Sequence, residues 1–565
     1  MEQVDRFTRH ARVAYFSMEI ALRPDVPTYA GGLGVLAGDT VRSAADLGIP
    51  LVAVTLVSRN GYFRQEIDAT GRQTEQPEPW DPERYATRLK AGVAVPIEGR
   101  DVWVSAWLYL VEGLTGGQVP VILLDTNLPF NARDDRAITD RLYGAGTVYR
   151  LMQETVLGIA GFRMLRALGF DTHKYHMNEG HSALLSLELM RRFAYPAELM
   201  RPGEPSFDLP RVRDMCVFTT HTPVEAGHDK FPYDMVARVL GDYVDIPMLK
   251  MLSGPDALNM TKLALSLSEY VNGVAERHAE TSRRLFPGQS VHSITNGVHA
   301  STWTGAAFTA LYDSWIPGWR HEPQLLMRAD RIPDGAVTGA HDVQKRALVD
   351  WIRTRHGVEL RLDRPIIGFA RRMTEYKRPD LLFADVERLR RIARARPFQL
   401  VFAGKAHPSD EPGKHLIALV HECLRQIRDE VPSVYVPDYD TDIALRLVGG
   451  ADIWLNTPLR PLEASGTSGM KAAFNAVPSL SILDGWWVEG CIEGINGWAI
   501  GDPLDTASSH DQEALYRTLE TTVLPLYHGD RPAWTAVMKG AITKSASYFN
   551  SHRMMRRYVS DAYMR

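Results

Sequence analysis

The sequence is poor in cysteine and has no excess of either charge. Its 565 residues include 3 cysteines, Cys216, Cys423 and Cys491, which form neither a disulfide framework nor a zinc-binding pattern. The 64 basic and 68 acidic residues give a net charge of −4. This balance does not favour nucleic acid or an anionic membrane as the main partner, and no metal site is predicted.

Long apolar runs are also missing. No stretch approaches the roughly 18 uninterrupted apolar residues that mark a membrane span. The first residues, Met1–Arg6, are not followed by the apolar run of a secretory signal. We therefore expect a soluble protein of the cytoplasm.

The chain is long enough for more than one hydrophobic core, because single cores stop growing near about 250–300 residues. Short apolar runs that end in Gly, Asn, Thr or His alternate with amphipathic helical stretches, a pattern typical of βαβ units and parallel sheets. The sequence therefore predicts an α/β fold. The expected strands include Val13–Met18, Pro50–Ser58, Val119–Thr126, Met215–Thr219, Pro365–Ala370, Leu400–Ala403 and Val434–Val436.

One stretch, Ile332–Lys345, is rich in Asp, Gly and Ala and is interpreted as a seam between two α/β series. This predicts an N-terminal domain over residues 1–340 and a Rossmann-like domain over residues 341–565. The last residues, Ala541–Arg565, are expected to form a helix that packs back across the seam. Because ligands bind beyond the carboxyl ends of strands in open α/β sheets, two such domains facing each other place a cleft between them.

A glycine-rich segment, residues 29–37 (YAGGLGVLA), precedes a predicted helix over Gly38–Leu47. Glycines let a backbone approach a ligand closely, and a helix N-terminus offers free N–H groups to an anion. A plain tight turn before a helix explains the same residues equally well.

A basic segment directly follows the predicted strand Pro365–Ala370. Four cations, Arg371, Arg372, Lys377 and Arg378, are crowded within it, which is costly unless an anion lies among them. Arginine offers forked donors that suit phosphate, and lysine offers a point charge. The alternative is a solvated basic turn.

A lysine lies where small polar residues give way to an apolar helix start, in residues 461–474. Lys471 is flanked by Met470, Ala472 and Phe474. Desolvation lowers the pKa of a lysine and makes its amine nucleophilic, so a Schiff base with an aldehyde cofactor would explain this position. The alternative is a surface lysine whose stem lies along the helix.

Three loops rich in histidine and asparagine each follow a predicted strand end. They cover residues 176–181, 220–223 and 295–299. Their spacing is not that of a metal site. Because Asn and His both donate and accept hydrogen bonds, recognition of sugar hydroxyls fits better, and a satisfied loop residue is the alternative for each.

Together these segments resemble the α-glucan (glycogen and maltodextrin) phosphorylase family. Matching blocks run in order from residues 15–19 (YFSME) to Asp484-Gly485, and EASGTSGMK (463–471) combined with EYKR (375–378) is specific. The resemblance implies two Rossmann-like domains facing a cleft, the GT-B glycosyltransferase architecture. It implies retaining phosphorolysis of terminal α-1,4-glucosidic bonds, with pyridoxal 5′-phosphate as cofactor. The partners are an α-glucan, inorganic phosphate and glucose 1-phosphate, and family habit implies a homodimer.

The resemblance also assigns roles to individual residues. It places the cofactor on Lys471, and it surrounds the cofactor with Arg371, Thr467, Ser468, Tyr439 and Asn456. Substrate phosphate is held by Arg372, Lys377 and the backbone N–H of Gly32. Sugar hydroxyls are held by Glu463, Ser465, Gly466, Tyr376, His221 and Asn296. Of these, Arg372, Lys377, His221 and Glu463 are expected to be catalytic.

Three positions depart from the family pattern. Arg371 stands where large members carry Lys, and Ser468-Gly469 replaces Gly-Asn. Tyr143-Gly144-Ala145-Gly146 lacks the acidic residue that short relatives carry after Tyr-Gly-Gly, which puts a substrate contact or a helix cap in doubt. The regulatory N-terminal segment of the animal enzymes has no counterpart, so no such regulation is expected.

Two other functions fit part of this pattern. A nucleotide-sugar-dependent glucan synthase of the same architecture also needs a glycine loop and basic residues, but it gives Lys471 no aldehyde to bind. A non-catalytic glucan-binding protein is the second alternative. The presence of Lys471, Arg372, Lys377 and Glu463 argues against it.

Overall fold

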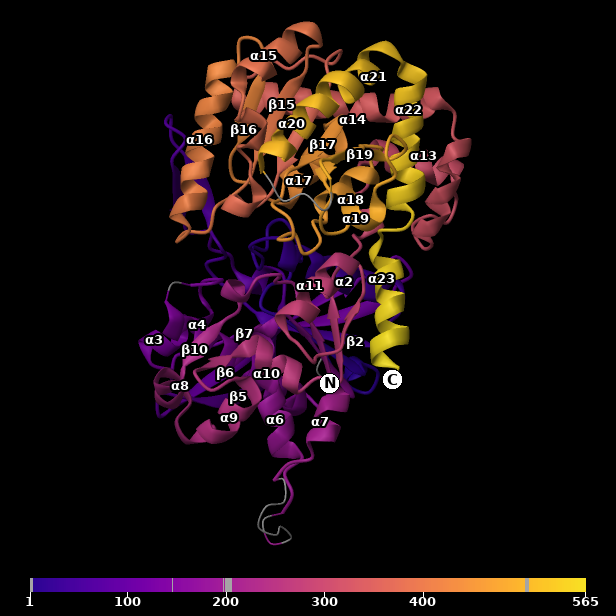
Figure 1. Ribbon diagram of the computed structural model, residues 1–565. Helices are drawn as coiled ribbons and strands as arrows, with labels where there is room; N and C mark the ends of the chain where they lie inside the picture. The colour runs from indigo at the N-terminus through magenta and orange to yellow at the C-terminus, as the bar shows by residue number, and fades with distance from the viewer. Residues whose placement is uncertain (1–3, 145, 197, 199–205, 503–507, 565) are drawn as a thin grey trace.

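The computed structural model describes residues 4–144, 146–196, 198, 206–502 and 508–564. Among these residues two large sheets organise the chain (Figure 1). The nine-stranded sheet has the order β13-β12-β9-β8-β1-β2-β7-β6-β5, and the six-stranded sheet has the order β16-β15-β14-β17-β18-β19. The six-stranded sheet is wholly parallel, and the nine-stranded sheet is parallel from β13 to β7. The predicted α/β class with parallel sheets is confirmed.

The strands are short and buried where the sheets are parallel. The nine-stranded sheet contains β1 (Val13–Ser17), β2 (Leu51–Leu56), β5 (Thr87–Ile97), β6 (Arg100–Glu112), β7 (Gln118–Asp125), β8 (Lys174–Asn178), β9 (Cys216–Thr219), β12 (Tyr270–Gly273) and β13 (Val291–Ser293). The six-stranded sheet contains β14 (Ile366–Ala370), β15 (Gln399–Ala403), β16 (Ser433–Val436), β17 (Ile453–Asn456), β18 (Ser479–Ile482) and β19 (Gly497–Ile500). Two small antiparallel sheets stand apart: the hairpin of β3 (Arg64–Ile67) with β4 (Gln73–Gln76), and the pair of β10 (Lys230–Pro232) with β11 (Ala257–Asn259).

Helices connect and cover the strands. Up to β13 they are α1 (Asp5–Thr8), α2 (Gly32–Asp46), α3 (Arg133–Arg136), α4 (Thr147–Thr155), α5 (Gly161–Ala167), α6 (Leu185–Arg192), α7 (Leu209–Met215), α8 (Tyr233–Leu240), α9 (Ile246–Ser253), α10 (Met260–Ser266) and α11 (Glu276–Leu285). After β13 they are α12 (Ala300–Trp303), α13 (Ala306–Trp315), α14 (Asp334–His356), α15 (Val386–Ala395), α16 (Glu411–Ile427), α17 (Thr441–Gly450), α18 (Ser468–Ala473), α19 (Trp487–Gly490), α20 (Ser508–Thr518), α21 (Leu524–Gly529), α22 (Arg531–Gly540) and α23 (Ser551–Tyr558). Within the described residues, none of these helices has the length and apolar character of a membrane span.

The expected strands named above all exist, and their ends agree within two residues. Strand β1 shows why the apolar runs are continuous. Its Ala14 and Phe16 enter one hydrophobic core, whereas Val13 and Tyr15 enter the core on the opposite face. A parallel strand that is covered on both faces needs apolar residues at every position.

The stretch Ile332–Lys345, interpreted as a seam, is helical over most of its length. Most of it forms the first half of α14, in which Val337 and His341 are buried. The helix packs against α13, α17 and α22. Pro333 and Asp334 are typical helix-start residues, and their signal was outweighed by the Gly and Ala content of the stretch.

The C-terminal helix α23 lies against the nine-stranded half of the molecule, beside α2 (Figure 1). The Ser551 and Ser43 hydroxyls are 2.5 Å apart. Near the other end of α23, the Tyr558 hydroxyl lies 3.1 Å from Thr219 Oγ1 and accepts from Asn272 Nδ2 at 3.1 Å. The last helix therefore bonds to the carboxyl ends of β9 and β12.

A buried carboxylate fixes the start of α23. Asp46 Oδ2 lies 2.7 Å from His299 Nε2 and 3.0 Å from His552 Nε2. The other nitrogen of His552, Nδ1, faces the carbonyl oxygen of His321 at 3.1 Å. Both ring nitrogens of His552 therefore face acceptor oxygens. Burial raises the pKa of Asp46, but the two histidines outweigh this and hold it well below its usual value.

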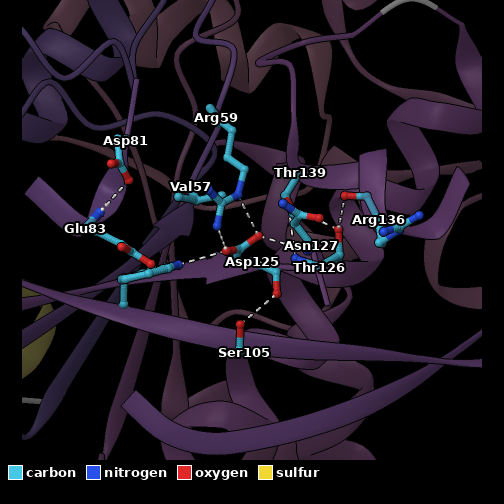
Figure 2. A network of polar contacts seen from close by, with 12 residues as sticks. Val57, Arg59, Asp81, Glu83, Ser105, Asp125, Thr126, Asn127, Arg136 and Thr139 are labelled. Atoms are coloured by element: carbon cyan, nitrogen blue, oxygen red, sulfur yellow. Dashed lines mark hydrogen bonds and ion pairs between the residues drawn. The ribbon is translucent and has the colours of Figure 1, made fainter. Parts of the chain in front are cut away.

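A partly buried ion pair joins neighbouring strands of the nine-stranded sheet (Figure 2). Arg59, in the loop after β2, bonds the carboxylate of Asp125 at the end of β7. Trp107 Nε1, from β6, donates to the same carboxylate at 2.8 Å. The Asp125 carboxylate at the end of β7 therefore bonds both to β6 and to the loop that follows β2.

We predict that Asp46→Asn lowers the stability of the protein by about 3 kcal/mol at neutral pH, because it breaks a buried charge pair. The native pKa of Asp46 is depressed, so its contribution is present above the unfolded pKa of about 4 and is lost as the pH falls below it. Thermal unfolding at pH 7 and at low pH measures the effect, and the difference between variant and wild type should shrink in acid.

The matched control is Asp313→Asn, which breaks a half-exposed pair with Arg320. It should cost less than about 1 kcal/mol. Equal losses for the two variants would contradict a special role of the Asp46 pair.

Candidate active site

The predicted cofactor residues and the basic segment lie near the reversal point of the six-stranded sheet, whereas Gly32, His221 and Asn296 lie in the nine-stranded half. The order of the six-stranded sheet corresponds to 3-2-1-4-5-6 in chain sequence, so the direction of winding reverses between β14 and β17. Ligands of doubly wound sheets bind beyond the strand ends at this point. Arg371 directly follows β14, and Asn456 ends β17. The nine-stranded sheet has its own reversal between β1 and β8, and the glycine-rich segment follows β1.

A shared carboxylate organises the basic segment. Arg371 bonds Glu463 Oε2, and Lys377 Nζ lies 2.6 Å from the same oxygen. All three side chains are at most 9% exposed. Burial raises the pKa of Glu463, but the charges of Arg371 and Lys377 outweigh it and bring the pKa to about 2. The cluster therefore holds one anion between two cations and carries a net positive charge.

Several polar atoms at this cluster are buried and have no partner within the described chain. They include Nε and Nη1 of Arg371 and the hydroxyl of Ser465. A buried donor without a partner costs about 1–3 kcal/mol, so such groups indicate that a ligand completes the site. Donors of this kind beside a positive cluster suit an anion such as phosphate.

One of the predicted cations belongs to a different contact. Arg378 donates to the carbonyl oxygens of Thr457 and Pro458 and to Asp511 Oδ2 at 2.7 Å. The interpretation of four cations around one anion is therefore wrong for Arg378. Its partner Asp511 lies in α20, 133 residues along the chain, and no local pattern announces it.

Lys471 lies in α18 and is 7% exposed. Its Nζ sits 3.8 Å from the ring centroid of Trp303, and among the described residues it forms no ion pair or hydrogen bond. Burial lowers the pKa of Lys471 to about 8. Its neighbours Met470, Ala472 and Phe474 are fully buried, as predicted. The Lys471 amine is therefore uncharged and nucleophilic in a much larger fraction of molecules near neutral pH than an ordinary lysine is.

The other predicted cofactor residues surround α18. Ser468 Oγ accepts from Trp454 and lies 3.5 Å from Asn456 Oδ1. Thr467 precedes the first residue of the helix, and its carbonyl oxygen accepts from the N–H of Lys471. Burial raises the pKa of Tyr439, and the nearby charge of Arg371 offsets this only in part. All four therefore lie near Lys471 or Arg371.

Arg372 and Tyr376 lie between the two halves of the molecule. The Arg372 side chain is exposed, unlike Arg371. It interacts electrostatically with Tyr376 and, from the first half of the chain, with Tyr62 and Glu19. Lys377 Nζ lies 4.4 Å from the ring centroid of Tyr376. Arg372 is thus placed opposite the glycine-rich segment.

The glycine-rich segment forms the start of α2, which begins at Gly32 and not at Gly38 as predicted. Gly34 and Gly38 lie within the helix and allow close packing. A Cβ at Gly34 would lie 2.6 Å from Glu19 Oε2, and one at Gly38 would lie 2.2 Å from the Ala21 carbonyl oxygen. By contrast, a Cβ at Gly31 or Gly32 would meet nothing within 4 Å. The first turn therefore faces open space in which an anion fits.

His221 and Asn296 lie at the carboxyl edge of the nine-stranded sheet. His221 Nε2 lies 2.6 Å from Asn178 Oδ1, and Asn178 Nδ2 donates to Ser17. His221 therefore donates from Nε2, and its Nδ1 is left as an acceptor. Burial lowers the pKa of His221 to about 3, so the ring is neutral. The Asn296 Oδ1 atom is buried and has no partner within the described chain.

His221 forms its hydrogen bonds with Glu179 and Asn178, which belong to the same half of the molecule, the half that contains the nine-stranded sheet. The Asn296 loop, however, reaches the other half, because Thr295 Oγ1 donates to Glu489 in α19 at 2.6 Å. Of the remaining predicted residues, Gly466 has φ +80°, which favours glycine, and its Cα lies beside Glu463.

Sequence reasoning missed three residues that shape the site. Glu19 Oε2 accepts from the N–H groups of Ala30 and Gly31 at 2.6 and 3.1 Å. The ring of Trp303 packs against the ammonium group of Lys471. Asp484 Oδ2 accepts from the N–H of Glu463 at 2.8 Å. Glu19 and Asp484 lie in sequence blocks that were recognised, but their roles depend on contacts with distant backbone groups.

The departure at Tyr143-Gly144-Ala145-Gly146 is resolved in part. Ala145 lies outside the described residues. Gly146 is the N-cap of α4, has φ +98° and has no side chain to cap the helix. The departure put a helix cap in doubt, and the start of α4 indeed has no side-chain cap.

Comparisons with known proteins agree with this geometry. A family model described as carbohydrate phosphorylase matches residues 245–493. Maltodextrin phosphorylase of Thermococcus litoralis is 40% identical, over 98% of this chain and 70% of its own length. Glycogen phosphorylase of Aquifex aeolicus is 35% identical over 98% and 86%, and that of Mycobacterium tuberculosis is 35% identical over 98% and 70%. The chain therefore belongs to the carbohydrate phosphorylase family.

Proposed function

We propose that this protein is an α-glucan phosphorylase. It transfers the terminal glucosyl unit of an α-1,4-glucan to inorganic phosphate and releases α-D-glucose 1-phosphate with retained configuration. The observation that supports this best is the pairing of a positive cluster, Arg371 and Lys377 on Glu463, with the buried, low-pKa Lys471. The names and identities of the relatives support the same reaction class.

The residues around Lys471 fit pyridoxal 5′-phosphate. The amine has the environment that favours attachment of an aldehyde, and the unpaired N–H groups of Arg371 fit the cofactor phosphate. Thr467 and Ser468 offer hydroxyls near by, and Tyr439 and Asn456 would flank the ring. When bound, this cofactor supplies a phosphate group that can pass a proton to the substrate phosphate.

Substrate phosphate would lie between the glycine-rich segment and the basic segment. Arg372 and Lys377 supply charge from one side, and the backbone N–H of Gly32 supplies a donor from the other. A phosphate at Lys377 would compete with Glu463 for its ammonium group. This competition would free a Glu463 oxygen to accept a sugar hydroxyl, with Ser465, Gly466 and Tyr376 beside it.

The sugar would contact the carboxyl edge of the nine-stranded sheet. The acceptor on His221 Nδ1 and the unpaired Asn296 Oδ1 suit the 6-hydroxyl. The carbonyl oxygen of His221 would stabilise positive charge on the ring as the glycosidic bond breaks. Protonation of the leaving oxygen and attack by phosphate occur on the same face, which retains the α-configuration.

This reaction needs a site that excludes water, because water would otherwise hydrolyse the bond. We propose that the two sheets belong to two Rossmann-like domains that face a cleft, the GT-B arrangement, with a boundary near residue 340. The reversal points of both sheets and the bonds between the halves support it. A homodimer and a cytoplasmic location stay predictions.

The direct test of the function is release of glucose 1-phosphate from maltodextrin by the purified protein, with and without inorganic phosphate. Phosphate-dependent release is expected. Product formation that needs a nucleotide sugar instead would support the synthase alternative, and glucan binding without any turnover would support the binding protein.

We predict that Lys471→Ala and Lys471→Arg both lose the cofactor and nearly all activity, because neither side chain can bond an aldehyde. Absorbance of the bound cofactor and the phosphorolysis assay measure this. In the wild type, cofactor loading onto the apo-protein should speed up as the pH rises through about 8, where the amine loses its proton. An active, cofactor-free Lys471→Arg variant would contradict the assignment.

We also predict that Lys377→Ala raises the KM for phosphate by tenfold or more, since a charged hydrogen bond contributes about 1.5–3 kcal/mol. The KM for maltodextrin should change much less. Initial-rate kinetics with each substrate varied in turn give both values. The control is Lys250→Ala, an exposed lysine on α9, which should alter neither. An unchanged phosphate KM for Lys377→Ala would refute this role.

A further inference from the structure

Hydrogen bonds connect the glycine-rich segment to Tyr143 through the side chain of Glu19. The Tyr143 hydroxyl donates to Glu19 Oε1 at 2.8 Å. The other oxygen of Glu19 accepts from the N–H groups of Ala30 and Gly31. One carboxylate, 3% exposed, therefore receives a side-chain bond on one oxygen and two backbone bonds on the other.

Glu19 has little freedom to move away from the segment. A Cβ at Gly34 would lie 2.6 Å from Glu19 Oε2, so the helix backbone packs directly on the carboxylate. Gly31 and Gly32, one turn earlier, face open space. The orientation of Glu19 therefore sets the position of the N–H groups at the start of α2.

Tyr143 is itself held from two sides. The Arg150 guanidinium carbon lies 4.4 Å from the Tyr143 ring centroid, and the ring of His181 approaches edge-on with a centroid distance of 5.9 Å. Arg150 is fixed in turn by Glu154 Oε1 and Asp229 Oδ2, each at 2.9 Å. Tyr143 also has φ +53°, a left-handed backbone that is costly for a tyrosine. Such a conformation persists only where the surroundings determine it.

We propose that Tyr143 is a positioning residue for phosphate binding. Its hydroxyl, aligned by Arg150, holds Glu19 against the backbone of the glycine-rich segment, and this keeps the start of α2 in place to receive the phosphate. The inference rests on the proposed function for the identity of the anion. Tyr143 does not touch the phosphate and acts only through Glu19.

The bonds to Glu19 are strongest while its carboxylate is ionised, because hydrogen bonds to a charged acceptor are stronger than those to a neutral carboxyl group. Burial raises the pKa of Glu19 above its usual value, and the donors at Ala30, Tyr143 and Gly31 and the charge of Arg372 offset this only in part. Tyr62 also lies within electrostatic range of Glu19. Loss of the Tyr143 hydroxyl removes one stabilising group and must raise the pKa of Glu19 further.

The test is Tyr143→Phe in the cofactor-loaded enzyme. The KM for phosphate should rise about fivefold, the effect of losing one hydrogen bond of about 1 kcal/mol, and the KM for maltodextrin should stay within about twofold. The acidic limb of the pH–rate profile should move to higher pH. Glu19→Gln should likewise raise the KM for phosphate more than the KM for maltodextrin. The double variant with Tyr143→Phe should have the same KM for phosphate as Glu19→Gln alone.

The matched control is Tyr149→Phe. Tyr149 lies on α4, close in sequence, but its hydroxyl donates to the carbonyl oxygen of Ala137 at 2.7 Å and has no bond to Glu19. This variant should leave the ratio of the two KM values unchanged. An equal rise of both KM values in Tyr143→Phe, or additive losses with Glu19→Gln, would overturn the inference.

Calorimetric titration with inorganic phosphate separates this inference from the proposed function. Tyr143→Phe should bind phosphate about fivefold more weakly than the wild type, whether or not glucan is turned over. A wild type that binds phosphate without releasing glucose 1-phosphate would refute the function alone. Equal phosphate affinities for the variant and the wild type would refute the positioning role.

Discussion

The site depends on one shared carboxylate. Glu463 lies between Arg371 and Lys377, and all three groups are buried. Removing such charges from water costs several kcal/mol per ion, and one carboxylate cannot fully compensate two cations. The structure therefore holds surplus positive charge and unpaired donors in its interior. A cluster in this state is destabilising by itself and is stabilised when an anion binds, as the proposed phosphate site requires.

The fold brings this cluster together from distant parts of the chain. Arg371 follows β14, whereas Glu463 lies in the loop after β17, the strand that pairs with β14 across the reversal of the sheet. The glycine-rich segment occupies the equivalent place beside β1. Trp303 crosses from the first half to lie under Lys471, and Asn475 Nδ2 donates to the carbonyl oxygen of Trp303 at 2.8 Å. Residues from both halves of the molecule therefore contribute to the candidate site.

Sequence reasoning succeeded where the signal is local. The continuous apolar runs predicted strands of both sheets. The apolar residues around Lys471 left a buried and a surface amine open, and the family resemblance favoured the buried one, which the structure shows. It failed where a partner lies far along the chain. Arg378 was assigned to the anion because its own acid, Asp511, cannot be seen from the segment 371–378. The start of α2 was placed too late because glycines favour turns, and only the packing of Gly34 and Gly38 against residues 19 and 21 shows why a helix needs them there.

The most direct test of the central claim is a crystal structure of the cofactor-loaded protein with inorganic phosphate. The account predicts a phosphate that contacts Arg372, Lys377 and the N–H of Gly32, with the Lys377 ammonium drawn away from Glu463. Phosphate bound elsewhere, with the bond between Lys377 and Glu463 intact, would contradict it.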